Sequence, residues 1–474
     1  MRAAVGRERW GYPVTTIRFE GRMSDQDALM WAIEKDPLLR STITSITLFD
    51  AGLDRERLLA QLDRATRMIP RLRQKVVSPP LGVAPPSWVV DPDFDLDYHV
   101  RFQRAPGDGT LRDLLDYAQP FAMSGFDRAR SLWEFVVFDG LEGGRSALVQ
   151  KMHHSLIDGV GAMKITMAFL DTTREGKDRG PLPEVPASER PDFVSLLRGG
   201  LGHNLRRVRG AVGRLPREVA ATALDPVGAT KQSARMAGSL VRMLRPVSEP
   251  LSPIMGGRSL SVRFDTLTGS LPDLKVAAKA ADGTLNDAFV AAVAGGLKRY
   301  HDKHGAEVEE LRMTMPINTR PNPDEVVAGN QFVPARFAFP LSIADPAERV
   351  RAMHRLLRGQ RDEPALGALG PVSTVLNQLP LGLSTAALGS MLKGIDVVTS
   401  NVPGAPIPIY AVGARMEANF GFGPLTGAGC NITLLSYLDE VHLGISTDPA
   451  AVPDPEVFVD CLQDGVDEVL ALGR

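Results

Sequence analysis

The sequence has few of the features that mark secreted or membrane-spanning proteins. Its 474 residues include only two cysteines, Cys430 and Cys461, so neither a disulfide framework nor a cysteine-built zinc site is expected. No uninterrupted apolar stretch reaches the roughly 18 residues that a membrane-spanning helix needs. The first ten residues lack the apolar core of a secretory signal. We therefore expect a protein that stays inside the cell and does not span a membrane.

The sequence also lacks an excess of charge of either sign, with 54 Lys and Arg residues against 56 Asp and Glu residues. The formal net charge is −2 at pH 7, which argues against a nucleic-acid-binding surface over the whole molecule. The glycines between positions 421 and 429 are not followed by the Lys-Ser/Thr pair of a phosphate-binding loop, so nucleotide binding there is not predicted. We predict no metal site, no cofactor and no nucleic-acid partner.

The chain is too long for one common core, and its patterns divide it into an extension, two lobes and a connector. Strand-like runs and helical periodicity mix in the first lobe, and helical segments such as 274–281, 285–301 and 455–472 recur in the second. The predicted parts are an N-terminal extension (1–22), an N-terminal lobe (23–175), a connector (176–258) and a C-terminal lobe (259–474).

The connector is rich first in proline and then in arginine. Between Asp192 and Arg245 it carries ten Lys and Arg residues against three acidic residues. A solvated helical crossover between the lobes explains this pattern. Basic helices with Leu, Val and Met on their other face could also bind anionic lipid headgroups, or basic side chains could meet the phosphates of coenzyme A.

The most informative segment is 148–163, in which His153 and His154 are followed by Asp158 and Gly159. An apolar strand-like run precedes the histidines, and helical spacing follows them, so they lie at a predicted strand-to-helix junction. Asp158 could cap the new helix, and Gly159 would let the backbone approach its neighbours closely. Such a turn would hold a histidine rigidly at the edge of a cavity.

This pattern resembles the HHxxxDG signature of the chloramphenicol acetyltransferase-like superfamily, which includes condensation domains and acyl-CoA-dependent acyltransferases. Within it, the chain resembles the bacterial wax ester synthase/diacylglycerol acyltransferases. Five further blocks carry the resemblance: residues 126–134 (PLW block), 285–287 (ND block), 329–330 (GN block), 400–406 (NVPGP block) and 23–31 (N-terminal helix). Ser131 replaces the usual Pro of the PLW block, and Ala405 separates Gly404 from Pro406. The resemblance implies an α/β, two-lobe, condensation-domain-like fold with a helical crossover connector.

The resemblance also implies roles for the turn. His154 would be the general base, because the second histidine has that role in the family, and a neutral imidazole suits the task at cell pH. His153 would face the other way and pack locally, since adjacent residues of an extended chain point to opposite sides. Asp158 would form a structural ion pair with one of several candidate arginines.

Gly159, Asn286 and Asn401 are candidate substrate-binding residues. Asn286 could donate to the thioester oxygen as charge develops on it. Its neighbour Asp287 is explained by capping alone, because Thr284 and Asp287 form an N-cap pattern. The segment around Asn401 is likewise explained by a strand that ends in a turn, although in the family it shapes the substrate tunnel.

The predicted function is O-acyl transfer from acyl-CoA, a co-substrate, to diacylglycerol or a long-chain alcohol. The expected location is the cytoplasm, with peripheral contact to the inner membrane face or lipid droplets. A carrier-dependent condensation-type enzyme and a non-catalytic lipid-binding protein are the alternatives. Turnover with free acyl-CoA distinguishes the first alternative, and lipid binding without coenzyme A release distinguishes the second.

Overall fold

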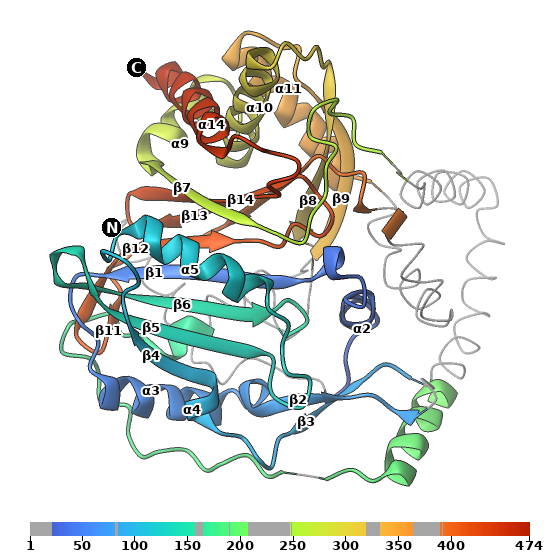
Figure 1. The fold of residues 1–474 in the computed structure, drawn as a ribbon, viewed down its shortest axis with the longest axis vertical. Helices are drawn as coiled ribbons and strands as arrows, with labels where there is room; N and C mark the ends of the chain where they lie inside the picture. The colour runs from blue at the N-terminus through green and yellow to red at the C-terminus, as the bar shows by residue number, and fades with distance from the viewer. Residues whose placement is uncertain are drawn as a thin grey trace, which may run out of the picture.

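The fold comes from a computed structural model, which describes most of the chain. The residues described are 21–80, 84–156, 165–188, 190–206, 247, 249–318, 332–363, 389–390 and 392–474. They form two α/β lobes, each built on a six-stranded sheet (Figure 1).

The first lobe contains a sheet with the strand order β11-β12-β1-β6-β5-β4. Its strands are β1 (Thr42–Phe49), β4 (Val100–Arg104), β5 (Trp133–Leu141), β6 (Arg145–His153), β11 (Tyr410–Ala411) and β12 (Ala414–Phe422). Its helices are α2 (Asp25–Ile33), α3 (Arg55–Met68), α4 (Leu96–His99) and α5 (Leu111–Met123), and a separate hairpin joins β2 (Gln74–Val77) to β3 (Ser87–Val90). Trp133 at the start of β5 lies in the core of this lobe and is 1% exposed.

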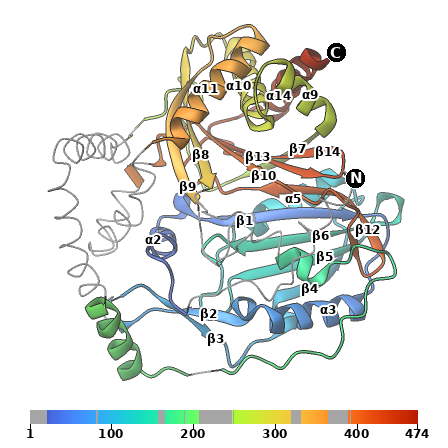
Figure 2. The same cartoon turned by 180° about the vertical axis from the view of Figure 1, so that it is seen from behind.

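The second lobe has the strand order β7-β14-β13-β10-β8-β9. Its strands are β7 (Arg263–Ser270), β8 (Glu310–Asn318), β9 (Phe332–Pro340), β10 (Val397–Val402), β13 (Cys430–Tyr437) and β14 (Glu440–Thr447). Its helices are α9 (Leu271–Ala280), α10 (Leu285–Lys303), α11 (Pro346–Arg361) and α14 (Pro455–Leu470). These helices cover the sheet face that points away from the first lobe (Figures 1 and 2). The central helix α10 is buried on nearly all sides, which explains its run of Ala, Val and Gly.

Strand β12 ties the two lobes together. It comes from the C-terminal part of the chain, yet it pairs antiparallel with β1 in the first sheet (Figure 2). β14 passes so close to β12 that a Cβ atom on Gly444 would lie 2.0 Å from the carbonyl oxygen of Gly421. The sequence does not predict that a strand from the C-terminal part of the chain joins the first sheet. The lobe boundaries given in the sequence analysis stay a prediction.

A shared hydrophobic cluster joins the lobes on one face of the first sheet. Leu114 of α5 and Val149 of β6 belong to the first lobe, and Phe264 of β7 packs with them. The rings of Phe264 and Phe422 stack with centroids 4.2 Å apart. The end of β6, which carries the histidines, is therefore held in a lobe that packs tightly against the second lobe.

The predicted helices and strands are largely confirmed. The helix predicted at 285–301 is α10, which begins with a reciprocal capping box between Thr284 and Asp287, and the helix predicted at 455–472 is α14. Helix α9 begins at Leu271, three residues before the predicted start, because Pro272 is tolerated in a first helical turn. Most of the connector's arginine-rich part, 207–246, lies outside the described residues.

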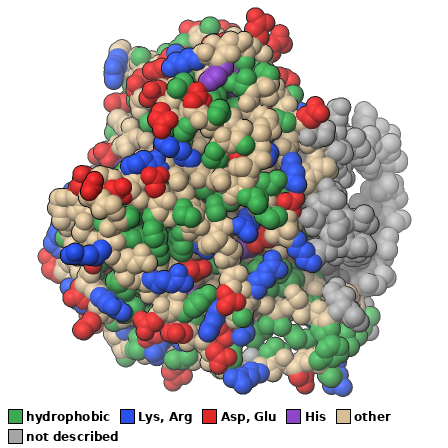
Figure 3. Space-filling model, in the orientation of Figure 1, with side chains coloured by type: hydrophobic (Ala, Val, Ile, Leu, Met, Phe, Trp, Pro, Cys, Tyr) green, Lys and Arg blue, Asp and Glu red, His purple; other side chains and the backbone are tan. Residues whose placement is uncertain are grey.

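No helix among the described residues has both the length and the apolar character to cross a membrane. Acidic and basic side chains are interspersed over the face of the molecule drawn in Figure 3.

Candidate active site

The histidine turn lies at the end of β6, between the first residues of β1 and β5. Thr42 of β1 is the register partner of His153. The amide N–H of His153 donates to the Leu132 carbonyl at 3.0 Å, and the amide N–H of His154 donates to the Ser41 carbonyl at 2.8 Å. The backbone of the turn is thus fixed from both sides, and the side chain of His154 is half-buried.

His153 is completely buried and is held through both ring nitrogens. Its Nδ1 accepts the Ser155 amide N–H at 3.0 Å and lies 2.7 Å from Ser155 Oγ. Its Nε2 lies 2.9 Å from Glu34 Oε1, a contact at ion-pair distance whose angle is poor for a linear hydrogen bond. Trp31 and Phe126 place ring edges against it at centroid distances of 5.5 and 6.0 Å. Because Nδ1 accepts a hydrogen bond from the Ser155 N–H, we assign the tautomer with hydrogen on Nε2.

Glu34 follows α2 and brings a carboxylate to the turn. Burial alone would raise its pKa, but the contact with His153 and the N–H of Ser41 hold the pKa below its usual value. The ring of Trp31, one helical turn earlier, also lies 4.2 Å from the guanidinium carbon of Arg128. The sequence analysis missed Glu34, since no local motif marks a contact that depends on residues distant in the chain.

Lys151 is a second buried charge on the same strand. Its side chain is 0% exposed, and its Nζ lies 3.3 Å from Glu134 Oε1 and 2.8 Å from Ser124 Oγ. The rings of Phe121 and Phe126 lie 4.9 and 4.5 Å from the same nitrogen. Lys151 therefore joins β6, β5 and the segment after α5 beneath the histidine turn, a role that the sequence analysis also missed.

The structure brings two of the predicted substrate-binding residues together. The side-chain amide of Asn401, on β10, donates to Oδ1 of Asn286 at 3.3 Å, and Nδ2 of Asn286 lies 3.5 Å from the sulfur of Met315. Both asparagines are half-buried. Asp287 points instead into the capping box and toward His354 Nδ1, at 2.8 Å. Capping and the contact with His354 account for Asp287, and the capping is the alternative that the sequence predicted.

The predicted Asp158 and Gly159 lie outside the described residues, as does the block at 329–330. The role of Asp158 in an ion pair therefore stays a prediction.

The segment after β10 needs one of its glycines. The Gly404 amide donates to Ser436 Oγ at 3.1 Å, and a Cβ atom at Gly404 would lie 1.7 Å from the carbonyl oxygen of Ser436. The inserted Ala405 is buried, and its carbonyl accepts the N–H of Leu438 at 3.0 Å. The departure from the family pattern is thus accommodated inside the packed turn.

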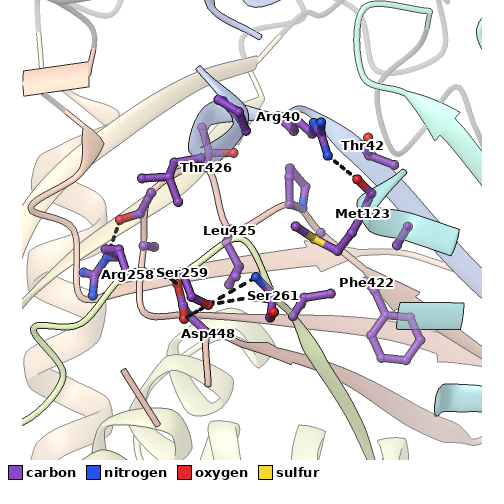
Figure 4. A pocket seen from close by; sticks show the side chains of 18 of the residues that line it. Arg40, Thr42, Met123, Arg258, Ser259, Ser261, Phe422, Leu425, Thr426 and Asp448 are labelled. Atoms are coloured by element: carbon purple, nitrogen blue, oxygen red, sulfur yellow. Dashed lines mark hydrogen bonds between the residues drawn. The ribbon is translucent and has the colours of Figure 1, made fainter. Parts of the chain in front are cut away.

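A groove opens between the lobes beside the start of β1 (Figure 4). It encloses about 580 Å³, which includes its solvent-filled mouth. Thr42 and Met123 line it from the first lobe, and Phe422 and Leu425 are among the residues that line it from the C-terminal part of the chain. Because Thr42 is the register partner of His153, the groove reaches the strand that borders the histidine turn.

The charged groups of the groove are paired by protein atoms. Arg40 donates to the carbonyl of Met123, and Arg258 donates to the carbonyls of Gly427 and Ile395. Asp448 accepts both the N–H and the hydroxyl of Ser259 at 2.6 Å, and Figure 4 shows these groups along one side of the groove. The groove is therefore suited to a mainly uncharged, apolar occupant.

Comparison with known proteins decides the family. Residues 23–289 match the family model of the wax ester synthase/diacylglycerol acyltransferase catalytic domain, and residues 328–469 match that of the family's C-terminal domain. The chain belongs to the wax ester synthase/diacylglycerol acyltransferase family. The first match includes the histidine turn and Asn286, and the second includes Asn401.

Individual relatives agree with this assignment. A Mycobacterium tuberculosis protein provisionally named a diacylglycerol O-acyltransferase is 37% identical over 464 residues, 95% of this chain and 93% of that protein. The wax ester synthase/diacylglycerol acyltransferase of Marinobacter aquaeolei VT8 matches 96% of this chain and 100% of its own with a TM-score of 0.61 at 22% identity. The first condensation domain of the calcium-dependent antibiotic synthetase matches 96% of each chain with a TM-score of 0.60 at 16% identity. The predicted family and two-lobe α/β fold are confirmed, and the protein is an acyltransferase.

Proposed function

We propose that this acyltransferase moves a long-chain acyl group from acyl-CoA to the hydroxyl of diacylglycerol or of a long-chain alcohol. The observation that carries the proposal is the fixed backbone of His154 directly after β6, beside the start of β1, whose Thr42 lines the groove between the lobes. The name of the mycobacterial relative favours diacylglycerol as one acceptor.

The reaction needs one base and no covalent enzyme intermediate. The His154 imidazole takes the proton of the acceptor hydroxyl while the hydroxyl oxygen attacks the carbonyl carbon of the thioester. The tetrahedral intermediate then expels coenzyme A, and the sulfur takes the proton back from the imidazolium. A positioned base of this kind contributes about 10² to 10⁴ in rate. The chemistry requires no metal or cofactor.

Asn286 is our candidate for stabilising the oxyanion of the intermediate. Asn401 donates to the Asn286 carbonyl oxygen, and the NH₂ group of Asn286 donates to the Met315 sulfur at 3.5 Å. An amide NH₂ group has two N–H donors, so Asn286 has a second one for the oxyanion. A side-chain amide donor aimed at a developing oxyanion is worth about 10² to 10³ in kcat. Gly159, which lies outside the described residues, remains a further candidate for substrate contact.

The inter-lobe groove supports a path for an acyl chain. Its lining includes Met123, Phe422 and Leu425, and its charged groups are already paired. A coenzyme A release assay with palmitoyl-CoA against diacylglycerols and long-chain alcohols tests the proposal. Release that depends on the acceptor and disappears in His154→Ala supports it.

The same assay separates the alternatives. A carrier-dependent condensation enzyme would not use free acyl-CoA. A non-catalytic lipid-binding protein would bind acyl chains equally well in His154→Ala and would release no coenzyme A.

We also propose that the enzyme contacts a lipid surface through the start of its connector. The helical segment 193–206 exposes Phe193, Val194, Leu201 and Leu205 by 63%, 49%, 54% and 52%. Arg198 and Arg206 lie on the same segment and are exposed as well. Exposed apolar side chains beside basic ones suit the interface of an anionic membrane.

Sedimentation with phosphatidylglycerol vesicles tests this contact. Replacing Leu201 and Leu205 with serine should weaken binding, whereas equal binding of the double variant would contradict the proposal.

A further inference from the structure

The carboxylate of Glu34 joins three segments of the first lobe at the histidine turn. It lies directly after α2, and its side chain is only 11% exposed. Its Oε1 accepts the amide N–H of Ser41 at 2.9 Å and lies 2.9 Å from His153 Nε2. One oxygen atom thus links the end of α2, the residue before β1 and the last residue of β6.

Two short routes lead from this oxygen to His154. Ser41, which donates its N–H to Glu34, accepts the N–H of His154 through its carbonyl at 2.8 Å. The second route runs through His153, which is adjacent to His154 in the chain and is fixed at Nδ1 by Ser155. Both routes constrain the backbone from which the His154 side chain projects.

The tautomer of His153 decides which group suits the contact. Because Nδ1 accepts the Ser155 N–H, the ring presents a hydrogen on Nε2, which favours an acceptor atom at the 2.9 Å contact with position 34, although the angle is poor for a linear hydrogen bond. Glu34 supplies that acceptor. Glutamine could also supply it through its carbonyl oxygen, whereas a leucine of similar size could not.

We infer that Glu34 is a positioning residue for the acyl transfer, which it serves by holding Ser41 and His153 so that the His154 imidazole is aimed at the acceptor hydroxyl. The inference rests on the proposed role of His154 as base. Glu34 does not line the described groove, so it should act on the chemical step and not on substrate binding.

The first arm of the test is kinetic. Glu34→Leu should lower kcat by about 10²-fold, the cost of misplacing a catalytic group by about 1 Å, and should leave KM within about twofold. Glu34→Gln keeps the acceptor oxygen and should restore kcat to within a few-fold of the wild type.

A matched control separates positioning from simple loss of stability. Asp91 is 3% exposed, lies in the same lobe and pairs with Lys75 at 2.9 Å. Asp91→Asn removes a buried carboxylate whose contacts are with Lys75, Arg130 and Asp93 and not with Glu34, Ser41 or His153, so it should lower the melting temperature without lowering the kcat of the folded enzyme.

The second arm needs no turnover. Nitrogen NMR of histidine-labelled full-length protein, assigned with single histidine variants, should show His153 protonated on Nε2 and unprotonated on Nδ1. Glu34→Leu should shift or split the His154 ring signals, and Glu34→Gln and Asp91→Asn should leave them in place.

Unchanged His154 signals in Glu34→Leu would overturn the inference, and so would a Glu34→Gln variant as impaired as Glu34→Leu. A failure of the proposed function has a different signature, because the wild type would then release no acceptor-dependent coenzyme A. The NMR arm would still decide whether Glu34 positions His154.

Discussion

The buried pair of Lys151 and Glu134 predicts an asymmetric response to mutation. Lys151 is 0% exposed, and Glu134 is its anionic partner at 3.3 Å. Glu134 has a second partner, Arg101, at 3.0 Å, whose side chain is 41% exposed. Removing Glu134 therefore leaves a fully buried ammonium group, whereas removing Lys151 leaves a carboxylate that is still paired.

The size of the effect follows from the burial. Breaking a buried ion pair on one side costs about 3–5 kcal/mol, and 1 kcal/mol corresponds to about 2–4 °C in a lobe of this size. Glu134→Gln should thus lower Tm by roughly 6–20 °C. Lys151→Met replaces the ammonium with an apolar group of similar length and should change Tm by only a few degrees.

The pH dependence of the stability of Glu134→Gln should reveal the buried, unpaired ammonium group of Lys151. Burial holds the pKa of Lys151 below its usual range, an effect that Glu134 partly offsets. Loss of Glu134 lowers the pKa of Lys151 in the folded state further. At pH values between this lowered pKa and the pKa of Lys151 in the unfolded chain, the unfolded state binds more protons than the folded state. Stability then rises with pH through that window, and the deficit of Glu134→Gln should shrink as the pH rises from about 7 to about 10.

Thermal melts of the wild type, Glu134→Gln, Lys151→Met and the double variant at about pH 7 and about pH 10 measure the stability deficit of each variant and its change with pH. The double variant should recover most of the stability lost in Glu134→Gln. A deficit that does not depend on pH, or a Lys151→Met protein less stable than Glu134→Gln, would refute the reasoning.

Three further predictions follow from the second lobe. Thr284→Ala should lower the free energy of unfolding by about 1 kcal/mol, because it removes the N-cap of α10, whereas Thr284→Ser should keep the cap. Equal melting temperatures of the wild type and both variants would argue against the cap. Asn286→Ala should lower kcat by about 10² to 10³ with little change in Tm, and an unchanged kcat would remove Asn286 from oxyanion stabilisation. Burial lowers the pKa of His442 to about 4, so the unfolded state binds more protons between about pH 6.5 and 4 and the fold loses stability as the pH falls through that window. Melts at pH 5 and 7 should show a shallower loss in His442→Leu than in the wild type, and equal slopes would contradict this origin.

Local chemistry explains which parts of the fold the sequence predicts. The start of α10 follows from Thr284 and Asp287 alone, because both capping bonds form within four residues. The end of β6 is predicted for the same reason, since the apolar run at 147–149 lies only a few residues before the histidines. Each of these signals is complete within a short segment.

Contacts between distant segments are not predictable in this way. Strand β12 could have paired within its own lobe, and only the packed structure reveals that it pairs with β1. Glu34 contacts His153, 119 positions later in the chain, and no pattern around either residue records the other. The pairing of Asn286 with Asn401 likewise depends on the fold that brings α10 beside β10.

The central claim is that the imidazole of His154 removes the proton of the acceptor hydroxyl. A single-turnover measurement of coenzyme A release, with excess enzyme, palmitoyl-CoA and a diacylglycerol, tests it most directly. We predict that His154→Ala slows this release by at least about 10²-fold while the protein melts at the wild-type temperature. Release at the wild-type rate from the folded variant would contradict the account.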